Sequence, residues 1–350
     1  MMNNLLIHSE NLIGLNYLLE HGYRGKIDLV YIDPPFATGG NFTITNGRAT
    51  TISNSRKGEL AYSDTLKGTD FIDFLRQRLI LIRELLSDEG SIYLHIDYKI
   101  GHYVKVMMDE VFGIENFRND ITRIKCNPKN FERIGFGNVK DLILFYTKTS
   151  SPIWNEPHDK YSEHDLEKLF PKKDKNGRHY TTVPIHAPGE TEKGTSNQPF
   201  KGIFPPHGRH WRTDVATLEQ WDQAGLIEWS ANGNPRKIIY ADERMGKRVQ
   251  DIWEYKDPQY PDYPTEKNAD MLDLIIKTSS NENSIVLDCF CGSGTTLKAA
   301  QLNHRIWIGI DQSNLAINAT KKKLDAITQD LFMTKTDYDI IEVSKELLPI

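Results

Sequence analysis

A short acidic and proline-rich motif ends an apolar run near the start of the chain. Residues 27–32 are mainly aliphatic and predict a buried strand, and Asp33-Pro34-Pro35-Phe36 follows directly. Each proline fixes its own φ and favours extended geometry in the preceding residue, so the Asp33 carboxylate and the Pro34 carbonyl should point the same way. Two acceptors beside an aromatic ring suit an exocyclic amine on a stacked base. Pro-Pro and Asp-Pro also occur in ordinary turns, so this motif alone does not distinguish a binding site from a strand-ending turn.

A second motif near the other end of the chain has the form of a nucleotide site. Residues 284–290 predict a buried strand, followed by the turn 291–296 (CGSGTT) and a helix over 297–302. Glycines let the backbone approach a ligand, and the first turn of a helix offers unpaired amides. A dinucleotide fingerprint needs another glycine where Leu297 stands, which disfavours a pyrophosphate ligand and NAD.

An acidic residue follows at a spacing that suits ribose recognition. The apolar stretch 305–310 predicts a strand that ends in Asp311, about twenty residues beyond the glycine turn. A carboxylate there can accept hydrogen bonds from ribose hydroxyls, or it can cap the helix expected over 315–324. Adenosine without a diphosphate fits this arrangement better than NAD.

The two motifs together resemble an amino-group DNA methyltransferase of the β arrangement, in which an Asp-Pro-Pro-aromatic motif precedes the S-adenosylmethionine motif. The chain is similar to the modification subunits of type III restriction systems and to their shorter stand-alone relatives, from Leu5 to about Leu324. The likeness includes the segments 6–12 (LIHSENL), 90–97 (GSIYLHID), 208–212 (GRHWR), 249–253 (VQDIW) and 263–268 (YPTEKN).

The resemblance implies transfer of a methyl group from S-adenosylmethionine to N6 of adenine in duplex DNA. Asp33 and the Pro34 carbonyl would accept the amine hydrogens, and Phe36 would stack on a base flipped out of the duplex. The catalytic set that it implies is Asp33, Pro34, Pro35 and Phe36. The cofactor-binding set that it implies is Asp288, Phe290, Gly292, Gly294, Thr295, Thr296, Asp311, Thr265 and Lys267. Of these, Thr265 and Lys267 would lie near the cofactor carboxylate, although Lys267 could equally be a surface lysine.

The chain departs from its relatives at three places. They usually carry Gly-Asp where this chain has Ser9-Glu10, Asn in place of Ala37, and Lys-Pro where it has Lys267-Asn268. Glu10 keeps the charge with one more methylene group, and Ala37 lacks a polar side chain beside the catalytic motif. These departures concern the positioning of the target base and leave the reaction type unchanged.

Competing enzyme classes differ at identifiable residues. A 5-methylcytosine enzyme attacks with a cysteine that commonly follows proline, and this chain contains no Pro-Cys pair. An N4-cytosine enzyme is the nearest alternative because it uses the same amine chemistry, but its relatives more often carry Ser where Asp33 stands. RNA and protein amino methyltransferases typically show Asn there. A modification subunit that works only with a partner restriction protein stays open, as do a homodimer and a cognate restriction endonuclease.

Alternating strands and helices predict a mainly parallel α/β sheet. The resemblance adds the Rossmann-like methyltransferase order of seven strands, circularly permuted, with both motifs on adjacent central strands. Ligands bind at the carboxyl ends of such strands, so the two motifs would form one active site. We expect a catalytic half over 1–149, a target-recognition insert over 150–262, a cofactor-binding half over 263–335 and a tail over 336–350.

Basic and aromatic residues are concentrated in the expected insert. Eight basic residues stand against three acids between positions 171 and 213, although the net charge of the whole chain is −5. Such a mixture suits phosphate contact and base reading, with an ordinary solvated loop as the alternative. The candidates for DNA contact are Lys172, Lys173, Arg178, Arg209 and Arg212. A second basic group, for which phosphate contact is also the functional interpretation, comprises Arg118, Arg123, Lys125, Lys129 and Arg133.

The remaining features exclude several classes of protein. The first residues lack the basic and apolar regions of a signal peptide, and no stretch approaches membrane-spanning length, so we expect a cytoplasmic protein. Three cysteines cannot build a disulfide framework, and their spacing is wrong for zinc, so no metal is expected. The polar loop 38–67 is either disordered or a lid that orders over cofactor or DNA, and its length favours the lid only modestly.

Overall fold

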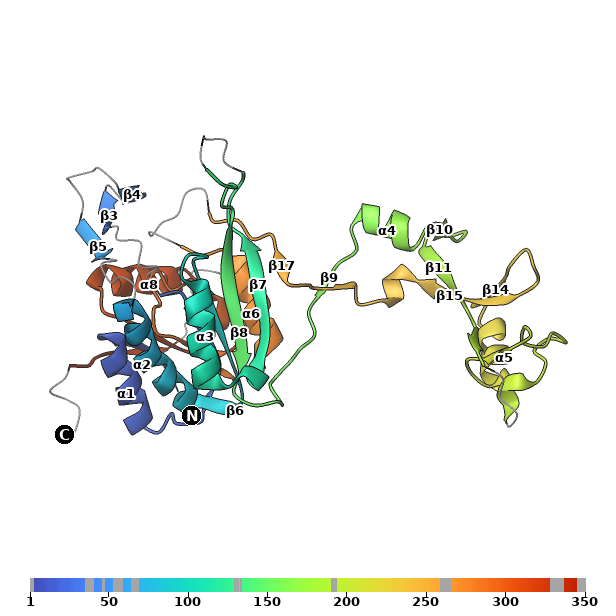
Figure 1. Cartoon of the computed structure of the whole chain (residues 1–350), viewed down its shortest axis with the longest axis horizontal. Helices are drawn as coiled ribbons and strands as arrows, with labels where there is room; N and C mark the ends of the chain where they lie inside the picture. The colour runs from blue at the N-terminus through green and yellow to red at the C-terminus, as the bar shows by residue number, and fades with distance from the viewer. Residues whose placement is uncertain are drawn as a thin grey trace. The chain divides into compact units, whose positions relative to one another are not determined.

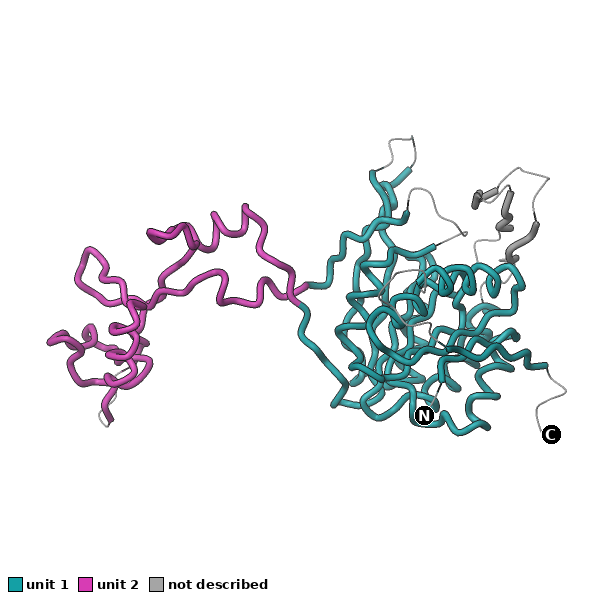
Figure 2. Tube along the Cα trace, turned by 180° about the vertical axis from the view of Figure 1, so that it is seen from behind, with its two compact units in different colours: residues 1–157, 250–350 teal, residues 158–249 magenta. Residues whose placement is uncertain are grey.

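The chain forms two compact units (Figure 1). A computed structural model describes residues 3–34, 41–45, 48–52, 59–63, 69–128, 132, 134–189, 194–258, 266–327 and 337–344. Unit 1 comprises Met1–Pro157 and Gln250–Ile350, and unit 2 comprises His158–Val249 (Figure 2). Unit 2 therefore falls inside the range 150–262 that the sequence suggested for an insert, while residues on both sides of it belong to unit 1.

A nine-stranded sheet lies at the centre of the described part of unit 1, in the order β17-β7-β8-β6-β2-β18-β19-β1-β20. Every neighbouring pair is parallel except those that β8 makes with β6 and β7. The strands are β1 (Asn4–His8), β2 (Ile27–Ile32), β6 (Leu86–Ile96), β7 (Phe117–Ile124), β8 (Lys140–Thr147), β17 (Ile252–Trp253), β18 (Ile285–Asp288), β19 (Ile306–Asp311) and β20 (Tyr338–Glu342). The mainly parallel α/β sheet is confirmed, and β17 and β20 extend the expected seven strands at its two edges.

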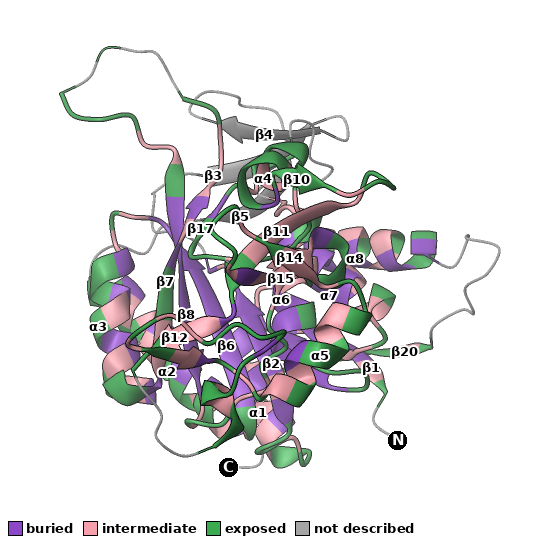
Figure 3. Ribbon diagram, turned by 90° about the vertical axis from the view of Figure 1, so that its right-hand side faces the viewer, coloured by how far each residue is buried: buried purple, intermediate pink, exposed green. Residues whose placement is uncertain are grey.

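Helices cover both faces of this sheet (Figures 1 and 3). One layer contains α1 (Asn11–Glu20), α2 (Thr69–Leu85) and α3 (Gly101–Phe112), with the short η1 (Ile114–Asn116) after it. The other contains α6 (Ala269–Ser279), α7 (Thr295–Leu302) and α8 (Asn314–Ile327). Their apolar faces form the core, as in α2, where Phe71, Leu75, Leu79 and Ile82 recur at helical spacing and are buried. No helix in the described residues is both long and apolar enough to cross a bilayer.

The two chemical motifs lie on neighbouring strands, as expected. β2 pairs with β18 in parallel, with Leu29 opposite Val286 and Val30 opposite Leu287. The start of this pair is fixed by Asp28, which accepts hydrogen bonds from the Ile285 amide (3.0 Å) and from the Ser87 hydroxyl of β6 (2.9 Å). Parallel pairing brings the carboxyl ends of both strands to one edge, where each motif begins.

Unit 2 is built from small sheets around a core of Ile185, Phe200, Trp211 and Leu218. A four-stranded antiparallel sheet has the order β10-β11-β15-β14, and β9 pairs with β16 where the chain enters and leaves the unit. Its strands are β9 (His158–Asp159), β10 (Lys172–Lys173), β11 (His179–Pro184), β12 (His186–Pro188), β13 (Arg209–Trp211), β14 (Ile227–Trp229), β15 (Pro235–Tyr240) and β16 (Lys247–Arg248). Its helices are α4 (Glu163–Leu169), η2 (Thr195–Asn197), α5 (Val215–Gln223) and η3 (Ala241–Glu243).

The polar segment 38–67 contains three further strands, which form an antiparallel sheet in the order β4-β3-β5. They are β3 (Asn41–Thr45), β4 (Arg48–Ile52) and β5 (Glu59–Ser63). The role of this segment as a lid stays a prediction, and its connecting residues lie outside the described part of the chain.

Candidate active site

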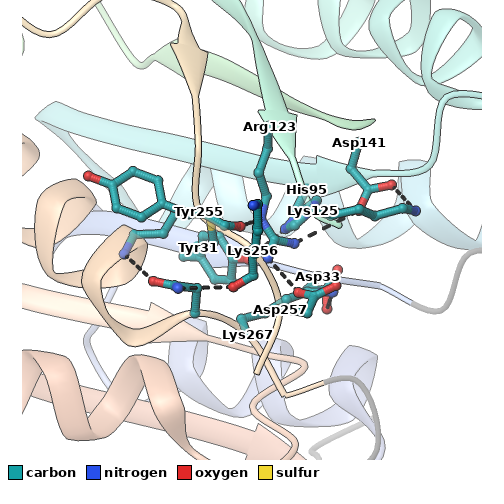
Figure 4. Close-up of polar contacts among 12 residues, drawn as sticks. Tyr31, Asp33, His95, Arg123, Lys125, Asp141, Tyr255, Lys256, Asp257 and Lys267 are labelled. Atoms are coloured by element: carbon teal, nitrogen blue, oxygen red, sulfur yellow. Dashed lines mark hydrogen bonds and ion pairs between the residues drawn. The ribbon is translucent and has the colours of Figure 1, made fainter. Parts of the chain in front are cut away.

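Asp33 stands at the end of β2 as one half of a buried ion pair (Figure 4). Its Oδ2 lies 2.8 Å from the ammonium nitrogen of Lys267, and the two side chains are only 16% and 10% exposed. Its Oδ1 is buried and accepts no hydrogen bond from any residue that the structure describes. One oxygen of this carboxylate is therefore held by a cation while the other keeps an unused acceptor. Pro34 is buried beside it, and Pro35, Phe36 and Ala37 lie outside the described residues.

Lys267 reaches Asp33 from the segment that precedes α6. The next residue, Asn268, caps this helix, because its Oδ1 accepts from the Met271 amide (3.1 Å). Its side-chain amide also donates to the Lys256 carbonyl (3.0 Å). Asn268 thus fixes the start of the helix where relatives usually carry proline. The placement of Lys267 near the cofactor carboxylate stays a prediction, and Thr265 lies outside the described residues.

The glycine turn after β18 is locked by its neighbours. Gly294 has φ +74°, and a Cβ atom there would lie 2.7 Å from the Thr320 hydroxyl oxygen, so both backbone and space require glycine. The Thr320 hydroxyl donates to the Gly292 carbonyl (3.0 Å), and the Gly292 amide donates to Asp311 Oδ2 (2.9 Å). α7 begins directly after Gly294, at Thr295. The turn, the end of β19 and α8 therefore form one rigid corner.

Two buried carboxyl groups flank this turn. Burial raises the pKa of Asp288 to about 7, although its Oδ1 accepts a hydrogen bond from the Phe290 amide (3.0 Å). Burial also raises the pKa of Asp311, whose oxygens accept from the Gly292 and Ser313 amides at 2.9 Å each. A cationic ligand would offset the cost of ionising such buried groups. These two carboxyl groups fit S-adenosylmethionine, which carries a positive sulfonium centre, a positive amino group and ribose hydroxyls.

Lys323 of α8 is a site residue that the sequence did not single out. Its ammonium donates to the hydroxyls of Ser293 (3.0 Å) and Thr295 (2.8 Å), and it forms an ion pair with Glu266. Glu266 directly precedes Lys267, so this lysine ties the glycine turn to the segment that supplies the partner of Asp33. It stands in a run of three lysines that predicts only a solvated helix face.

A second cluster, also not anticipated as such, supports the turn from the side of α1. Glu10 caps α1 by accepting from the Ile13 amide (3.2 Å), and it forms an ion pair with the buried Arg78 of α2. Arg78 also donates to Asn11 Oδ1 (2.5 Å), and the Asn11 side chain donates to the Cys289 carbonyl (3.3 Å). The longer Glu10, which stands where relatives carry aspartate, therefore acts both as a cap and as an ion-pair partner.

The basic candidates in unit 2 lie at its surface and contact neighbours there. Lys172 forms an ion pair with Glu228, while Arg178 pairs with Asp242 (2.7 Å) and Glu243 (3.0 Å). Lys173 is exposed, and both Arg209 and Arg212 donate to His186, to its ring Nδ1 and its carbonyl respectively, at 3.2 Å. Their contact with DNA stays a prediction.

Two members of the second basic group that the structure describes, Arg118 and Arg123, make contacts within the fold. The Arg123 side chain is completely buried, so the suggestion that it contacts phosphate is wrong. Arg118 is used inside the fold, where it donates to the Thr147 hydroxyl and the Thr149 carbonyl, both at 3.0 Å. The sequence shows that these basic residues are close along the chain, but not which face of a strand each one occupies. The pairing of β7 with β8 turns the Arg123 side chain into the interior. Lys129 and Arg133 lie outside the described residues.

Comparisons with known proteins show which family the chain belongs to. The DNA methylase family model named for N6 and N4 methyltransferases matches residues 27–322. Type II methyltransferase M.EcaI of Enterobacter cloacae is 42% identical over 326 residues, which cover 91% of this chain and 69% of that protein. The StyLTI Mod subunit, a type III restriction-modification enzyme of Salmonella typhimurium, is 27% identical over 336 residues, covering 85% of this chain and 49% of that protein. A crystal structure of the M1.HpyAVI-SAM complex has 15% identity and a TM-score of 0.49, and the match covers 92% of this chain and 99% of that one. The chain belongs to the N6/N4 DNA methylase family.

Proposed function

We propose that this chain transfers a methyl group from S-adenosylmethionine to N6 of adenine in duplex DNA. The observation that carries the proposal is the pairing of β2 with β18, which brings the acceptor corner at Asp33 to the same sheet edge as the glycine turn. N4 of cytosine is the alternative target, because the same acceptors suit its amine. Asp33, where N4-cytosine relatives more often carry serine, favours adenine.

Asp33 acts as the acceptor that activates the target amine. Lys267 holds Oδ2, so Oδ1 remains to accept a hydrogen from the exocyclic nitrogen, and the Pro34 carbonyl accepts the second hydrogen. Accepting both hydrogens draws the nitrogen lone pair out of conjugation with the ring and towards the incoming methyl group. The nitrogen gains the methyl group as the bond between that group and sulfur breaks, which leaves a neutral thioether, and the nitrogen loses one proton to the Asp33 carboxylate or to solvent. Acceptors oriented before the reaction need no rearrangement in the transition state.

The glycine turn holds the methyl donor. S-adenosylmethionine supplies an electrophilic methyl group on a positively charged sulfur when it is bound. Asp288 and Asp311 supply buried carboxylates for its cationic groups and ribose hydroxyls. Gly292 and Gly294 add no side chains at their own positions in the turn, and Thr295 and Thr296 present the first amides of α7.

Unit 2 is the proposed target-recognition module. Its exposed basic side chains, Lys172, Lys173, Arg178, Arg209 and Arg212, would contact the phosphate backbone, which fixes position on the duplex without reading sequence. The flipped base then enters the corner beside Asp33. The similarity to a Mod subunit supports a partner restriction endonuclease as one possibility, and a homodimer stays a prediction.

The test is to identify the labelled base. The protein is incubated with S-adenosylmethionine that carries an isotopic label on its methyl group and with unmethylated genomic DNA, which is then digested to nucleosides. We expect the label on N6-methyl-2′-deoxyadenosine. Label on N4-methylcytosine would reject the adenine assignment, and absence of label from DNA by a protein that binds the cofactor would reject transfer to DNA.

A further inference from the structure

A row of polar side chains crosses one face of the sheet beside Asp33. In β8, Ile143 lies opposite His95 of β6, and Asp141, two residues earlier, lies opposite Arg123 of β7. Side chains alternate between the faces of a strand, so His95, Asp141 and Arg123 share one face. Tyr31 of β2 joins them through a hydrogen bond from strand to strand. Tyr31, His95, Asp141 and Arg123 are called the polar row below.

The members of the polar row are in contact and removed from solvent (Figure 4). The Tyr31 hydroxyl lies 2.9 Å from His95 Nδ1, and His95 Nε2 lies 3.3 Å from Asp141 Oδ2. An Arg123 nitrogen lies 3.9 Å from the same Asp141 oxygen. The side chains of His95, Asp141 and Arg123 are 0%, 2% and 0% exposed. Lys125 donates to the other Asp141 oxygen at 2.6 Å.

The charges determine the direction of these hydrogen bonds. Burial opposes ionisation of Asp141, yet hydrogen bonds from His95 and Lys125 hold its pKa well below the ordinary value, so it is a carboxylate and only accepts. His95 must therefore donate from Nε2. Burial, together with the nearby charge of Lys267, lowers the pKa of His95, so its Nδ1 is unprotonated and accepts from Tyr31. Burial raises the pKa of Tyr31, which keeps that donor protonated.

One end of the polar row is fastened to the segment by which the chain re-enters unit 1 after unit 2. Arg123 donates to the Tyr255 carbonyl (2.8 Å) and forms an ion pair with Asp257. The Asp257 amide donates to the Lys125 carbonyl (2.9 Å). Asn268, the residue after Lys267, donates to the Lys256 carbonyl and so holds the same segment.

The other end of the polar row lies beside the Asp33–Lys267 pair. Tyr31 precedes Asp33 by two residues on β2, and the opposite charges of Lys267 and Asp33 both act on the His95 ring. A neutral His95 imidazole does not repel the Lys267 ammonium, which can therefore pair with Asp33. A protonated imidazolium would repel that ammonium. Buried ionic groups contribute little net stability compared with apolar residues of the same size. Stability therefore does not by itself explain why the sheet keeps these buried charges.

We infer that His95, Asp141 and Arg123 are positioning residues for methyl transfer. They fix the position of the Asp33–Lys267 pair relative to residues 250–258, the segment that returns from unit 2. The inference rests on the proposed function for its kinetic consequence. Its structural consequence, that Arg123 and Asp141 order residues 250–258 and 266–268, is independent of that function.

The kinetic test compares Arg123→Lys and Asp141→Asn with a matched control on the same strand, Arg118→Lys. Arg118, at the opposite end of β7, also donates hydrogen bonds within the fold, to the Thr147 hydroxyl and the Thr149 carbonyl. With cofactor and DNA both saturating, we expect the single-turnover rate to fall at least about tenfold in the two row variants, while affinity for S-adenosylmethionine stays within about twofold. The control should keep the wild-type rate. A wild-type rate in both row variants would overturn the inference, and so would a loss that follows melting temperature equally in all three proteins.

A second measurement needs no activity. Hydrogen–deuterium exchange of the intact chain should show faster exchange over 250–258 and 266–268 in Arg123→Lys and Asp141→Asn, with no change there in Arg118→Lys. Unchanged protection of both segments in the row variants would contradict the positioning role. If the wild-type protein transferred no methyl group, the proposed function and the kinetic part of the inference would both fail. The exchange pattern would still decide the structural part of the inference. If the label appeared on cytosine, the same comparison of rates would apply to that base.

Discussion

The charged groups at the sheet edge of unit 1 and those at the surface of unit 2 occupy opposite environments. At the sheet edge of unit 1, Asp33 pairs with Lys267 and Asp141 pairs with Arg123, and all four side chains are nearly or completely removed from solvent. In unit 2, Arg178 and its partners Asp242 and Glu243 lie at an exposed surface. Buried charges are held in one geometry, whereas exposed pairs are weak and readily exchange partners. The first environment suits catalysis by fixed groups, and the second suits exchange of a carboxylate for a phosphate.

The most damaging change to the fixed environment should be Gly294→Ala. The new methyl group would meet Thr320, and the left-handed backbone adds strain of about 1–3 kcal/mol. We expect loss of cofactor binding by calorimetry and therefore of transfer. Gly225→Ala in unit 2 is the matched control, because Gly225 has φ +70° but nothing within 4 Å of a Cβ atom. Cofactor binding that survives in Gly294→Ala would show that the turn is not the cofactor site.

Removing the ion-pair partner of Asp33 should have the next largest effect. Lys267→Met would free Asp33 Oδ2 and let the carboxylate rotate, so we expect the transfer rate at saturating substrates to fall by about 10²-fold. Lys267→Arg should recover part of the rate. Lys277→Met, which removes an exposed pair with Asp273 on α6, should have no effect. A rate that is unchanged while cofactor affinity collapses would place Lys267 at the cofactor carboxylate instead.

The pH dependence of cofactor binding tests the buried carboxyl group beside the turn. Because burial raises the pKa of Asp288 to about 7, much of this group is protonated at pH 6, and a cationic ligand must displace that proton. Affinity for S-adenosylmethionine should therefore rise with pH, by at most about tenfold per unit below the pKa, and level off above pH 8. Calorimetry across this range should show proton release on binding. Asp288→Asn should bind more weakly with a flatter profile, and an equal slope in that variant would exclude Asp288 as the source.

The smallest effects are expected at the surface of unit 2. Lys172→Met and Arg178→Met should leave the melting temperature nearly unchanged, because exposed ion pairs contribute little. Each should weaken DNA binding several-fold and reduce the slope of log affinity against log salt by about one. Lys201→Met, which removes another exposed pair, with Asp222, is the control. Equal salt slopes in all of these proteins would remove Lys172 and Arg178 from the DNA-contacting set.

The fold could be predicted from the sequence where the pattern is local. The apolar run of β2, the helical spacing in α2 and the strand–turn–helix around Gly294 follow from periodicity and glycine. The adjacency of β2 and β18 came from the family resemblance. Strands β3 to β5 were not anticipated, because their segment is rich in polar and turn-forming residues.

The parts of the site that the sequence did not reveal depend on tertiary register. Nothing local indicates that Lys267 would meet Asp33, that Lys323 would meet the hydroxyls of the glycine turn, or that Arg123 would face the interior. His95 stood in a segment shared with the family, yet only the pairing of β6 with β8 shows its contact with Asp141. Charge and residue type predict chemistry, whereas strand pairing decides which groups meet.

The most direct test of a single transfer site uses a bisubstrate analogue, in which N6 of adenine is joined by a short linker to the methyl-donor position of the cofactor. If Asp33 and the glycine turn face one ligand, the analogue should bind more tightly than S-adenosylmethionine does. Asp33→Ala should abolish that gain and leave affinity for the cofactor unchanged. An analogue that binds no more tightly than the cofactor, with an affinity unaffected by Asp33→Ala, would contradict the account.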